Sequence, residues 1–269
     1  KKRTISFNIK RIIKVGSMDQ DLVVGIHSIA EAIKNPARTI IELVGTKEGI
    51  DELKKRQVRI DKIPQDKIQI VDSHKVQEYA KKWYQQLDYE FSRVPSGVYL
   101  VCSAVEQYEP TWLYDQLLTG KPISILALDQ VTDVHNAAAI MRTASFYGID
   151  CILISMKGNF GTGPNFSRIA SGAIEHVKVV RCASLTKTLT KLVEMKVNVI
   201  GLSEHATDNE IKVYKENSTC LVLGAEDEGM SNAVSRVVPQ TIALKSQGDI
   251  KSLNVSVAAA VAMEKIFGK

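Results

Sequence analysis

The stretch ISILALDQVTDVHNAAAIMRTASFYGIDCILIS, residues 123–155, decides the fold. It begins with a near-continuous apolar run, continues through a polar loop into a helix-like segment, and ends in a second apolar run. Strands without polar alternation, each followed by a helix, are typical of a parallel sheet that is covered on both faces. The stretch therefore predicts an α/β fold with a parallel sheet in the C-terminal half of the chain.

The same alternation continues to the C-terminus. Strand-like and helix-like segments follow in the order VKVVR, LTKTLTKLVEM, VNVIGLS, TCLVLG, NAVSRVV, TIALK and VSVAAAVAMEKIF. Ligands of such sheets bind in the loops at the carboxyl ends of the strands. We therefore expect the functional site in the loops DQVTDVHNA, SMKGNFGTGPN, SEHATDN, GAEDEGMSN and KSQGDIKSLN.

The N-terminal half predicts a second, smaller α/β unit. Its strand-like segments are TIIELVG, KIQIVD and GVYLVCSAVE, and its helix-like segments are GIHSIAEAIKN, EGIDELKKRQV and SHKVQEYAKKWY. Ser73 is the predicted N-cap of the last helix. We assign residues 21–105 to this domain. Residues 106–121, punctuated by proline and glycine, predict a linker with one short helix, and residues 122–269 form the second domain.

Composition argues for a soluble intracellular protein and against a metal site. No apolar run is long enough to span a bilayer, and no signal peptide is visible, so we expect a cytoplasmic location. The four cysteines are widely spaced in apolar segments and form no CxxC pattern, and the five histidines are equally scattered. This usage predicts buried free thiols in a reducing compartment.

The formal net charge of +5 comes from a basic N-terminal arm, residues 1–20. Residues 1–17 carry six Lys or Arg side chains and no acidic one, which leaves 29 basic and 30 acidic side chains in the rest of the chain. Such arms commonly bind nucleic-acid phosphates. A solvated tail is an equally good interpretation.

Two of the loops carry candidate residues. In LVLGAEDEGMSNAV, Glu226 lies between Gly224 and Gly229, and glycines there allow backbone N–H groups to approach a ligand. Three consecutive acids favour a neutral or cationic ligand over a phosphate, and an ordinary glycine-containing turn is the alternative. After the first strand, Asn136 is the predicted helix N-cap. Six residues later, Arg142 forms either a structural ion pair or a substrate clamp.

The terminal segment KSLNVSVAAAVAMEKIF, residues 251–267, opens with polar residues and continues as an apolar helix. Ser252 or Asn254 could cap the free N–H groups of this helix. Capping accounts for one polar side chain, but not for the others, which include Ser256, nor for the glycine-containing loop SQGDI before them. The entrance of the helix is therefore a candidate site.

Three blocks of the chain resemble the SpoU family of RNA ribose 2′-O-methyltransferases, in order and in separation: VTDVHNAAAIMRTASFYG, LVLGAEDEGMS and LKSQGDIKSLNVSVAAAVA. From VVGIHSIAEAIKN onward, the N-terminal half resembles the ribosomal-protein-like RNA-binding domain of the large-subunit rRNA guanosine-2′-O-methyltransferases of bacteria and mitochondria. The resemblance covers residues 21–269. The sequence departs from it at Val134 and Lys245, where the family usually has Pro, and at Ala137 and Ala138, where a Leu-Gly or Ile-Gly pair is common.

The resemblance implies a SPOUT-class fold, in which a C-terminal parallel-sheet domain contains a deep trefoil knot. General topology rules weigh against knots, so this expectation comes from the resemblance alone. The implied cofactor is S-adenosylmethionine, and the implied partner is RNA, with a guanosine of large-subunit rRNA as the expected target. A homodimer packed through the knotted region is implied as well, without a membrane or metal partner. In a eukaryote the location would be mitochondrial.

The resemblance also assigns roles to individual residues. The catalytic set falls on Asn136, Arg142, Glu226, Ser252 and Asn254, and the cofactor contacts fall on Leu223, Gly224, Gly229, Leu244, Ser246, Gly248 and Leu253. Arg142 is expected to position the ribose, because a guanidinium keeps its proton up to a pKa above about 12. Glu226 is expected to orient Arg142 through an ion pair. Ser252 and Asn254 are expected to bind the ribose or the neighbouring RNA backbone.

Two other functions stay open at this point. The chain could methylate a ribose of tRNA, or it could be an RNA-binding or ribosome-assembly protein of the same fold with impaired catalysis. A dinucleotide-dependent enzyme fits poorly, because the glycine-rich loop GNFGTGPNFS does not match the G-x-G-x-x-G fingerprint.

Overall fold

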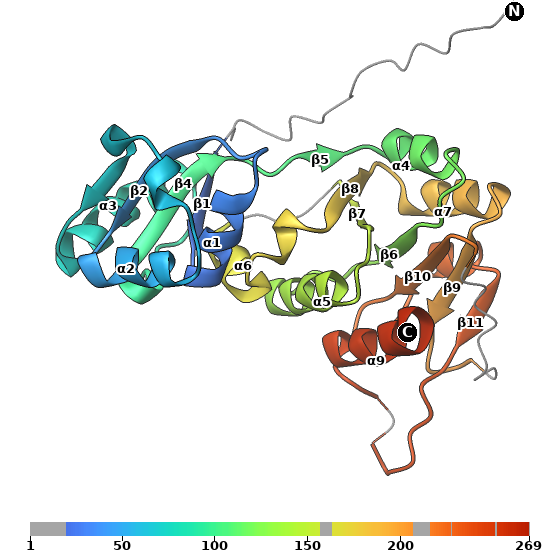
Figure 1. Ribbon diagram of the computed structural model, residues 1–269. Coiled ribbons are helices and arrows are strands. Elements are labelled where there is room, and N and C mark those ends of the chain that lie inside the picture. Colours follow the sequence, from blue (N-terminus) through green and yellow to red (C-terminus); the bar gives the residue numbers. More distant parts are fainter. Residues whose placement is uncertain (1–19, 157–162, 207–215, 227, 251, 269) are drawn as a thin grey trace, which may run out of the picture.

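The structure is a computed structural model that describes residues 20–156, 163–206, 216–226, 228–250 and 252–268. Two α/β units lie side by side, the N-terminal one in blue and green and the C-terminal one in green to red (Figure 1). Apart from Gln20, the predicted basic arm lies outside the described residues, as does most of the glycine-rich loop, residues 157–162. Within the described ranges, no helix is both long enough and apolar enough to cross a membrane.

The N-terminal unit is a four-stranded sheet with the strand order β1-β4-β2-β3. Its strands are β1 (Gln20–Val24), β2 (Ile40–Gly45), β3 (Ile68–Ile70) and β4 (Val98–Ser103). Its helices are α1 (Ile26–Lys34), α2 (Lys47–Lys55) and α3 (Ser73–Gln86), with short 3₁₀ turns η1 (Ile60–Lys62), η2 (Gln65–Lys67) and η3 (Pro95–Gly97). Helices α1 and α2 share one apolar core with the sheet, and α3 shares a second core on the opposite face.

The structure confirms the helices and strands predicted for this half and makes two corrections. Strand β1, which the sequence pattern did not predict, pairs antiparallel with β4. The N-cap of α3 is Asp72 rather than Ser73, because the Asp72 carboxylate accepts a hydrogen bond from the Lys75 N–H at 2.9 Å. Asp and Ser both cap helices well, so propensity alone does not choose between them. Asp72 is the N-cap because it lies three residues before Lys75, whose N–H has no partner within the helix.

The C-terminal unit contains a sheet of seven described strands in the order β11-β9-β10-β6-β7-β8-β5. All of its pairings are parallel, as predicted. The strands are β5 (Gln107–Tyr108), β6 (Ser124–Leu128), β7 (Cys151–Ser155), β8 (Lys178–Cys182), β9 (Asn198–Leu202), β10 (Thr219–Leu223) and β11 (Gln240–Ile242). The helical elements are α4 (Pro110–Leu117), α5 (Val134–Phe146), α6 (Pro164–Ala170), η4 (Ala173–Glu175), α7 (Leu185–Glu194), α8 (Asn232–Ser235) and α9 (Val255–Phe267).

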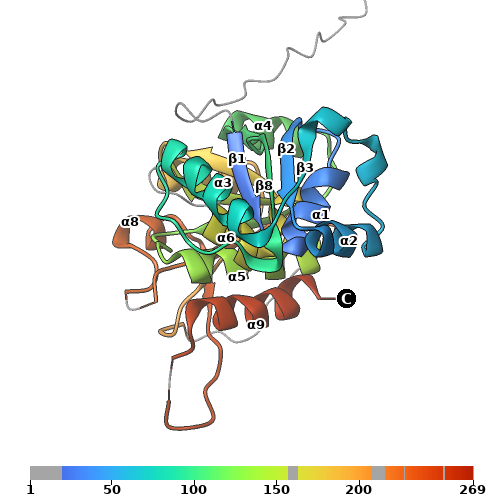
Figure 2. The same ribbon diagram turned by 90° about the vertical axis from the view of Figure 1, so that its left-hand side faces the viewer.

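Helices cover both faces of this sheet, which explains why its strands lack polar alternation. Helices α5, α6 and α9 pack on one face, and α4, α7 and α8 pack on the other. Alternate residues of each strand belong to the two cores; in β6, for example, Leu126 faces the first and Ile125 the second. Figure 2 shows α9 running beneath α5, the helix it contacts.

The segment predicted as a linker contributes to the C-terminal sheet. Strand β5 forms one edge of the sheet by pairing with β8, and the predicted short helix is α4, which also contacts β8. An edge strand of two residues carries too little periodic pattern to be predicted from sequence.

All four cysteines are free and buried, as predicted. Burial raises the pKa of the Cys182 thiol to about 11 and that of Cys102 to about 12. Because the thiolate is the reactive form, these side chains act as small apolar core residues.

Candidate active site

The candidate site lies at the carboxyl ends of the neighbouring strands β6 and β10, where α9 begins. Asn254 donates a hydrogen bond to Oδ1 of Asn136 at 3.0 Å and another to Oε1 of Glu226. The N–H of Val255 donates to the same Glu226 oxygen at 3.3 Å. Three of the five predicted catalytic residues, from segments 90 and 28 residues apart, thus form one junction. We call Asn136, Glu226 and Asn254 the polar junction.

Helix α5 places Asn136 in this junction. The N-cap of α5 is Asp133, whose carboxylate accepts a hydrogen bond from the Asn136 N–H at 2.8 Å. The prediction that Asn136 itself is the cap is therefore wrong, and its side chain is available for contacts outside the helix. Val134 occupies the first helical position, where proline is favoured, which explains why the usual Pro can be replaced there without loss of the helix.

Helix α9 places Asn254 in the junction, and here the predicted capping role is confirmed. Oδ1 of Asn254 accepts from the Ser256 N–H at 3.0 Å and from the Ser256 hydroxyl at 2.5 Å. The amide nitrogen of the same side chain is left to bind Asn136 and Glu226. The carboxylate of Glu226 faces the positive end of the α9 dipole, where a negative charge is stabilised. Ser252 is exposed two residues before the cap.

The loop after β10 is a tight turn built on two glycines. A Cβ on Gly224 would lie 2.0 Å from the carbonyl carbon of Gly229, so this position accepts no side chain. The backbones of Ala225 and Gly229 exchange hydrogen bonds of 2.9 and 3.1 Å, and Gly229 has a φ of 65°. This turn holds Glu226 at its tip, next to the start of α9.

Asp129 is a site residue that the sequence analysis missed. Its side chain is buried at the end of β6, and its carboxylate accepts from the Ser231 N–H at 2.7 Å. Its own N–H donates to the Leu223 carbonyl at 2.8 Å. Asp129 therefore ties the end of β6 to the loop after β10. The available signal was an acid placed directly after a buried strand.

Arg142 lies apart from the polar junction. It is exposed on α5 and forms no ion pair with any described residue, so the predicted ion pair with Glu226 is not present. Six residues separate Arg142 from Asn136, which places the two side chains about 120° apart around the helix. Phe146, four residues further, is 82% exposed on the same face as Arg142.

The predicted cofactor residues line the loops beside the junction in two ways. Leu223 is 1% exposed, so only its backbone can face a ligand, whereas Leu253 is 52% exposed and Leu244 is half-buried. Cβ atoms added to Gly229 or Gly248 would meet no described atom within 4 Å. Apolar side chains next to open glycine backbone suit a ligand with an apolar face and polar edges.

Ser246 shapes the loop between β11 and α9. Its hydroxyl lies 3.1 Å from the carbonyl oxygen of Gly248 and 2.5 Å from that of Ile250. These contacts fold the loop on itself without a partner from another element. In the described part of the chain, no group of three or more His, Cys, Asp or Glu side chains is arranged to hold a metal ion.

Comparison with known proteins identifies relatives of this architecture. The model of a family described as the SpoU rRNA Methylase family matches residues 124–264, just over half of the chain and all of the candidate site. A protein of Staphylococcus aureus (strain COL) that is assigned to the TrmH family of tRNA/rRNA methyltransferases is 27% identical over 264 residues. The alignment covers 94% of this chain and 97% of that protein.

Solved structures share the fold over nearly the whole chain. The SpoU methyltransferase AviRb of Streptomyces viridochromogenes, solved in complex with AdoMet, has a TM-score of 0.69 at 18% identity, covering 92% of this chain and 89% of that one. An RNA 2′-O ribose methyltransferase has a TM-score of 0.70 at 18% identity, covering 93% of this chain and 88% of that one. Both domains, and not only the site-bearing one, therefore occur together in known folds.

Proposed function

The chain belongs to the SpoU rRNA Methylase family, and we propose that it transfers a methyl group from S-adenosylmethionine to a ribose 2′-hydroxyl of RNA, with a guanosine of large-subunit rRNA as the target. The observation that carries the proposal is the polar junction, in which three residues of the family's catalytic set meet at the carboxyl ends of parallel strands. Parallel sheets bind their ligands at this edge.

The cofactor S-adenosylmethionine supplies an electrophilic methyl group when it is bound. The residues present fit its adenosyl part. Leu253 and Leu244 offer apolar surface to a base, and the open space beside Gly229 and Gly248 lets a ligand approach the chain there. Recognition through backbone explains how this loop tolerates Lys245 in place of the usual Pro.

Glu226 and Asn254 form the fixed part of the site in this proposal. Because the Glu226 carboxylate accepts from the Asn254 amide and the Val255 N–H, it holds the first turn of α9 in place rather than orienting Arg142. Ser252, exposed just before that turn, is then placed to bind the ribose or the adjacent RNA backbone.

Arg142 is the exposed, charged part of the site in this proposal. Its guanidinium is exposed and forms no ion pair with a described residue, so it can donate hydrogen bonds to RNA without breaking an internal contact. A guanidinium keeps its proton at neutral pH and cannot serve as the base. Arg142 positions the ribose and stabilises the negative charge that develops on O2′, and a neighbouring RNA phosphate oxygen takes the proton.

We propose further that two copies of the chain pair through α5 and α9. The outer face of α9 exposes Val257 (49%) and Val261 (38%), and Phe146 on the contacting helix α5 is 82% exposed. Val257 and Val261 are four residues apart and so share one face of α9, and apolar side chains that gather on a surface mark interaction sites. We also propose that the C-terminal domain contains the trefoil knot. The support is that the chain returns after β11 and begins α9 against the loop that follows β10.

The choice of rRNA rests on the N-terminal domain, which resembles a ribosomal-protein-like RNA-binding fold. The relatives are assigned to a family of tRNA and rRNA methyltransferases, so tRNA is the second candidate. The test is to incubate the purified chain with labelled S-adenosylmethionine in three separate reactions, which contain large-subunit rRNA, small-subunit rRNA or tRNA. We expect 2′-O-methylation of one guanosine in large-subunit rRNA.

The other outcomes of this test separate the alternatives. Label in tRNA alone would replace the rRNA target with the tRNA one. Absence of transfer to any RNA, together with no heat of S-adenosylmethionine binding in calorimetry, would leave an RNA-binding protein without catalysis.

A further inference from the structure

We propose that Arg38 locks the N-terminal domain rigidly onto the C-terminal domain, so that the two move as one body and the distance from bound RNA to the methylation site is fixed. This inference deepens the proposed function, and its role in RNA selection rests on that function. Arg38 is a positioning residue in this account, because it touches neither the polar junction nor the loops beside it.

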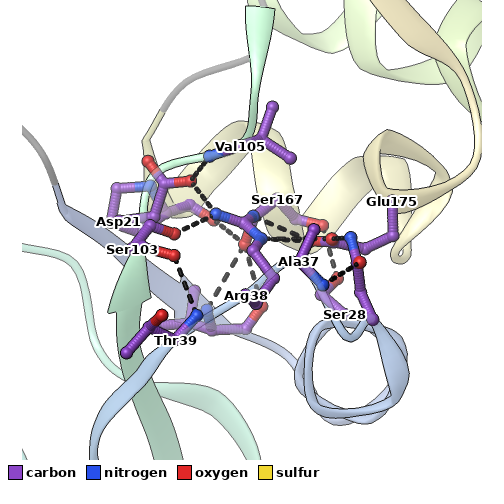
Figure 3. A network of polar contacts seen from close by, with 12 residues as sticks. Asp21, Ser28, Ala37, Arg38, Thr39, Ser103, Val105, Ser167 and Glu175 are labelled. Atoms are coloured by element: carbon purple, nitrogen blue, oxygen red, sulfur yellow. Dashed lines mark hydrogen bonds and ion pairs between the residues drawn. The ribbon is translucent and has the colours of Figure 1, made fainter.

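Arg38 lies between α1 and β2, and its side chain is only 3% exposed. Nη2 lies 2.7 Å from Oε1 of Glu175, and Nε lies 3.1 Å from Oε2 of the same carboxylate, which makes the contact bidentate (Figure 3). Nη1 lies 2.7 Å from Oδ2 of Asp21 and also donates to the carbonyl of Ser103. Glu175 belongs to η4 of the C-terminal domain, whereas Asp21 and Ser103 belong to β1 and β4 of the N-terminal domain. We call Arg38, Asp21 and Glu175 the interdomain clamp.

The clamp also holds the chain where it passes between the domains. Oδ2 of Asp21 accepts a second hydrogen bond, from the N–H of Val105, at 3.1 Å. Val105 lies two residues after the end of β4 and two residues before β5, the first strand of the C-terminal sheet. One carboxylate therefore fixes both the guanidinium and the connecting chain, so the crossing point cannot act as a free hinge while the clamp is closed.

Further hydrogen bonds surround the clamp. Asn35 donates to Oε2 of Glu175 at 2.7 Å, and the Ser28 hydroxyl donates to the carbonyl of Ser167 at 2.5 Å. The Ser167 hydroxyl lies 3.3 Å from both the N–H and the carbonyl of Val24. These contacts join β1 and α1 to α6 and η4, and all cross the domain boundary. Because bidentate and multiple hydrogen bonds have narrow geometry, they allow one orientation of the domains.

Side chains of the N-terminal domain pack directly against glycine backbone at this boundary, which leaves little room for a side chain at two positions. A Cβ on Gly172 would lie 2.7 Å from Cγ of Glu31, and one on Gly163 would lie 2.9 Å from a ring carbon of Tyr89. Interfaces between tethered domains are usually loose and allow relative motion. A close-packed boundary with a buried charge at its centre has the opposite property, since separation would leave charges without partners.

Energetics of the charge support a closed clamp. Burial opposes the charged form of Arg38, but the carboxylates of Glu175 and Asp21 outweigh it, and the pKa of the guanidinium is raised. The Glu175 side chain is equally buried, at 3% exposed. Replacement of either Arg38 or Glu175 would leave the charge of the other residue buried and unpaired. A partial separation of the two domains would have the same effect.

The interdomain clamp is connected to the candidate active site through α5, the helix that carries site residues. Elements η4 and α6, which the N-terminal domain contacts, both pack on α5, and α5 carries Asn136 and Arg142. An RNA held by the N-terminal domain is thereby presented to these side chains at a set distance. A fixed distance favours RNAs whose target nucleotide lies at the matching separation from the bound feature.

The test compares clamp variants with a matched control in the same domain. Glu175→Gln keeps the shape of the side chain and removes its charge, and Arg38→Ala removes the guanidinium. The control is Arg59→Ala, because Arg59 pairs with Asp61 at the surface, with side chains 67% and 64% exposed. The first readout is hydrogen exchange of residues 164–175 and the radius of gyration in solution, neither of which depends on activity.

We expect both clamp variants to exchange faster in residues 164–175 and to have a larger radius, while Arg59→Ala matches the unmodified chain. The second readout is kinetic. The KM for full-length rRNA should rise about tenfold or more in the clamp variants, with S-adenosylmethionine affinity and kcat on a short RNA that carries only the target nucleotide unchanged. Arg38→Lys should restore the charge but not the bidentate contact, and should recover only part of the KM.

Unchanged exchange and radius in Glu175→Gln would overturn the proposal, and this variant decides the matter if Arg38→Ala does not fold. An open boundary with an unchanged KM for full-length rRNA would overturn the role in RNA selection. If the unmodified chain transfers no methyl group, the proposed function fails, but exchange and radius still test the clamp on their own.

Discussion

The polar junction and the interdomain clamp are both clusters of polar side chains drawn from distant parts of the chain, but they differ in exposure and charge. The junction consists of half-buried Asn136 and of exposed Glu226 and Asn254. The clamp consists of Arg38, Asp21 and Glu175, and its bidentate pair of Arg38 with Glu175 is buried. Exposed groups can exchange their partners for a substrate at small cost, whereas a buried charge cannot leave its partner without a large penalty. The comparison suggests that one cluster works by contact with RNA and the other by immobility.

The largest effect is expected where the site is charged and unpaired. Replacement of Arg142 by Ala should lower kcat about 10³-fold, because it removes the group that stabilises charge on O2′. Arg142→Lys should recover only part of the rate, since an ammonium lacks the planar fork. Single-turnover methyl transfer measures the rate, and RNA affinity is measured separately. Full turnover with Lys would contradict the positioning role.

The second largest effect is expected on stability, when the interdomain clamp is broken. Arg38→Ala leaves Glu175 buried without its cation and should lower the free energy of unfolding by about 3 kcal/mol. The exposed Arg59→Ala control should produce no measurable change. Urea denaturation of the three proteins compares them directly. Equal losses of unfolding free energy in Arg38→Ala and Arg59→Ala would show that the buried ion pair contributes no more to stability than the exposed one.

Asn254 tests whether the junction does more than cap a helix. Asn254→Ala removes the α9 cap and should destabilise the protein by about 1 kcal/mol; it should also slow methyl transfer at least about tenfold. Asp72→Ala is the matched control, because it removes the α3 cap in the N-terminal domain, away from the site. Chemical denaturation and transfer rates are measured on both. A slow Asp72 variant would mean that loss of a cap alone explains the rate.

The smallest effect concerns a peripheral contact across the domain boundary. Nε2 of His176 lies 2.9 Å from Oε2 of Glu31. Burial raises the pKa of Glu31, but hydrogen bonds from Lys34 and His176 outweigh it, and the pKa lies below the usual value. A lowered folded-state pKa stabilises the protein above the unfolded-state value and loses that contribution as the pH falls through the folded one.

The expected result is therefore a small stability loss below about pH 4.5, smaller in Glu31→Gln than in the unmodified chain. Thermal unfolding between pH 3 and 6 measures it. An identical pH profile for the two proteins would show that this contact does not contribute to the boundary.

Sequence reasoning predicted the elements that a periodic apolar pattern marks. It was wrong where two nearby residues of equal propensity could each cap the same helix. The parallel sheet followed from unbroken apolar strands such as residues 123–129, and the Asn254 cap followed from its position before an apolar helix. The Asn136 cap was wrong because α5 begins earlier, at Val134, and Asp133 caps it by accepting from the N–H of Asn136. Local propensity ranks both residue types alike, and only the actual start of α5 separates them.

The clamp could not be predicted, because nothing local marks it. Arg38 and Glu175 are 137 residues apart, and each looks like an ordinary surface charge in its own segment. Asp129 differs, because its place directly after a buried strand was a local signal, although the sequence alone reads it as a loop acid and the structure buries it. The absent Arg142–Glu226 pair is the reverse case. Shared membership in a site predicted a contact between the two side chains, but Arg142 lies about 120° around α5 from Asn136, the residue that does reach the junction.

The most direct test of the central claim is nucleoside analysis of large-subunit rRNA after incubation with S-adenosylmethionine and either the unmodified chain or Arg142→Ala. The account predicts that 2′-O-methylguanosine appears with the unmodified chain and is nearly absent with the variant. Methylation on a base instead of a ribose, or equal yields of 2′-O-methylguanosine from both proteins, would contradict it.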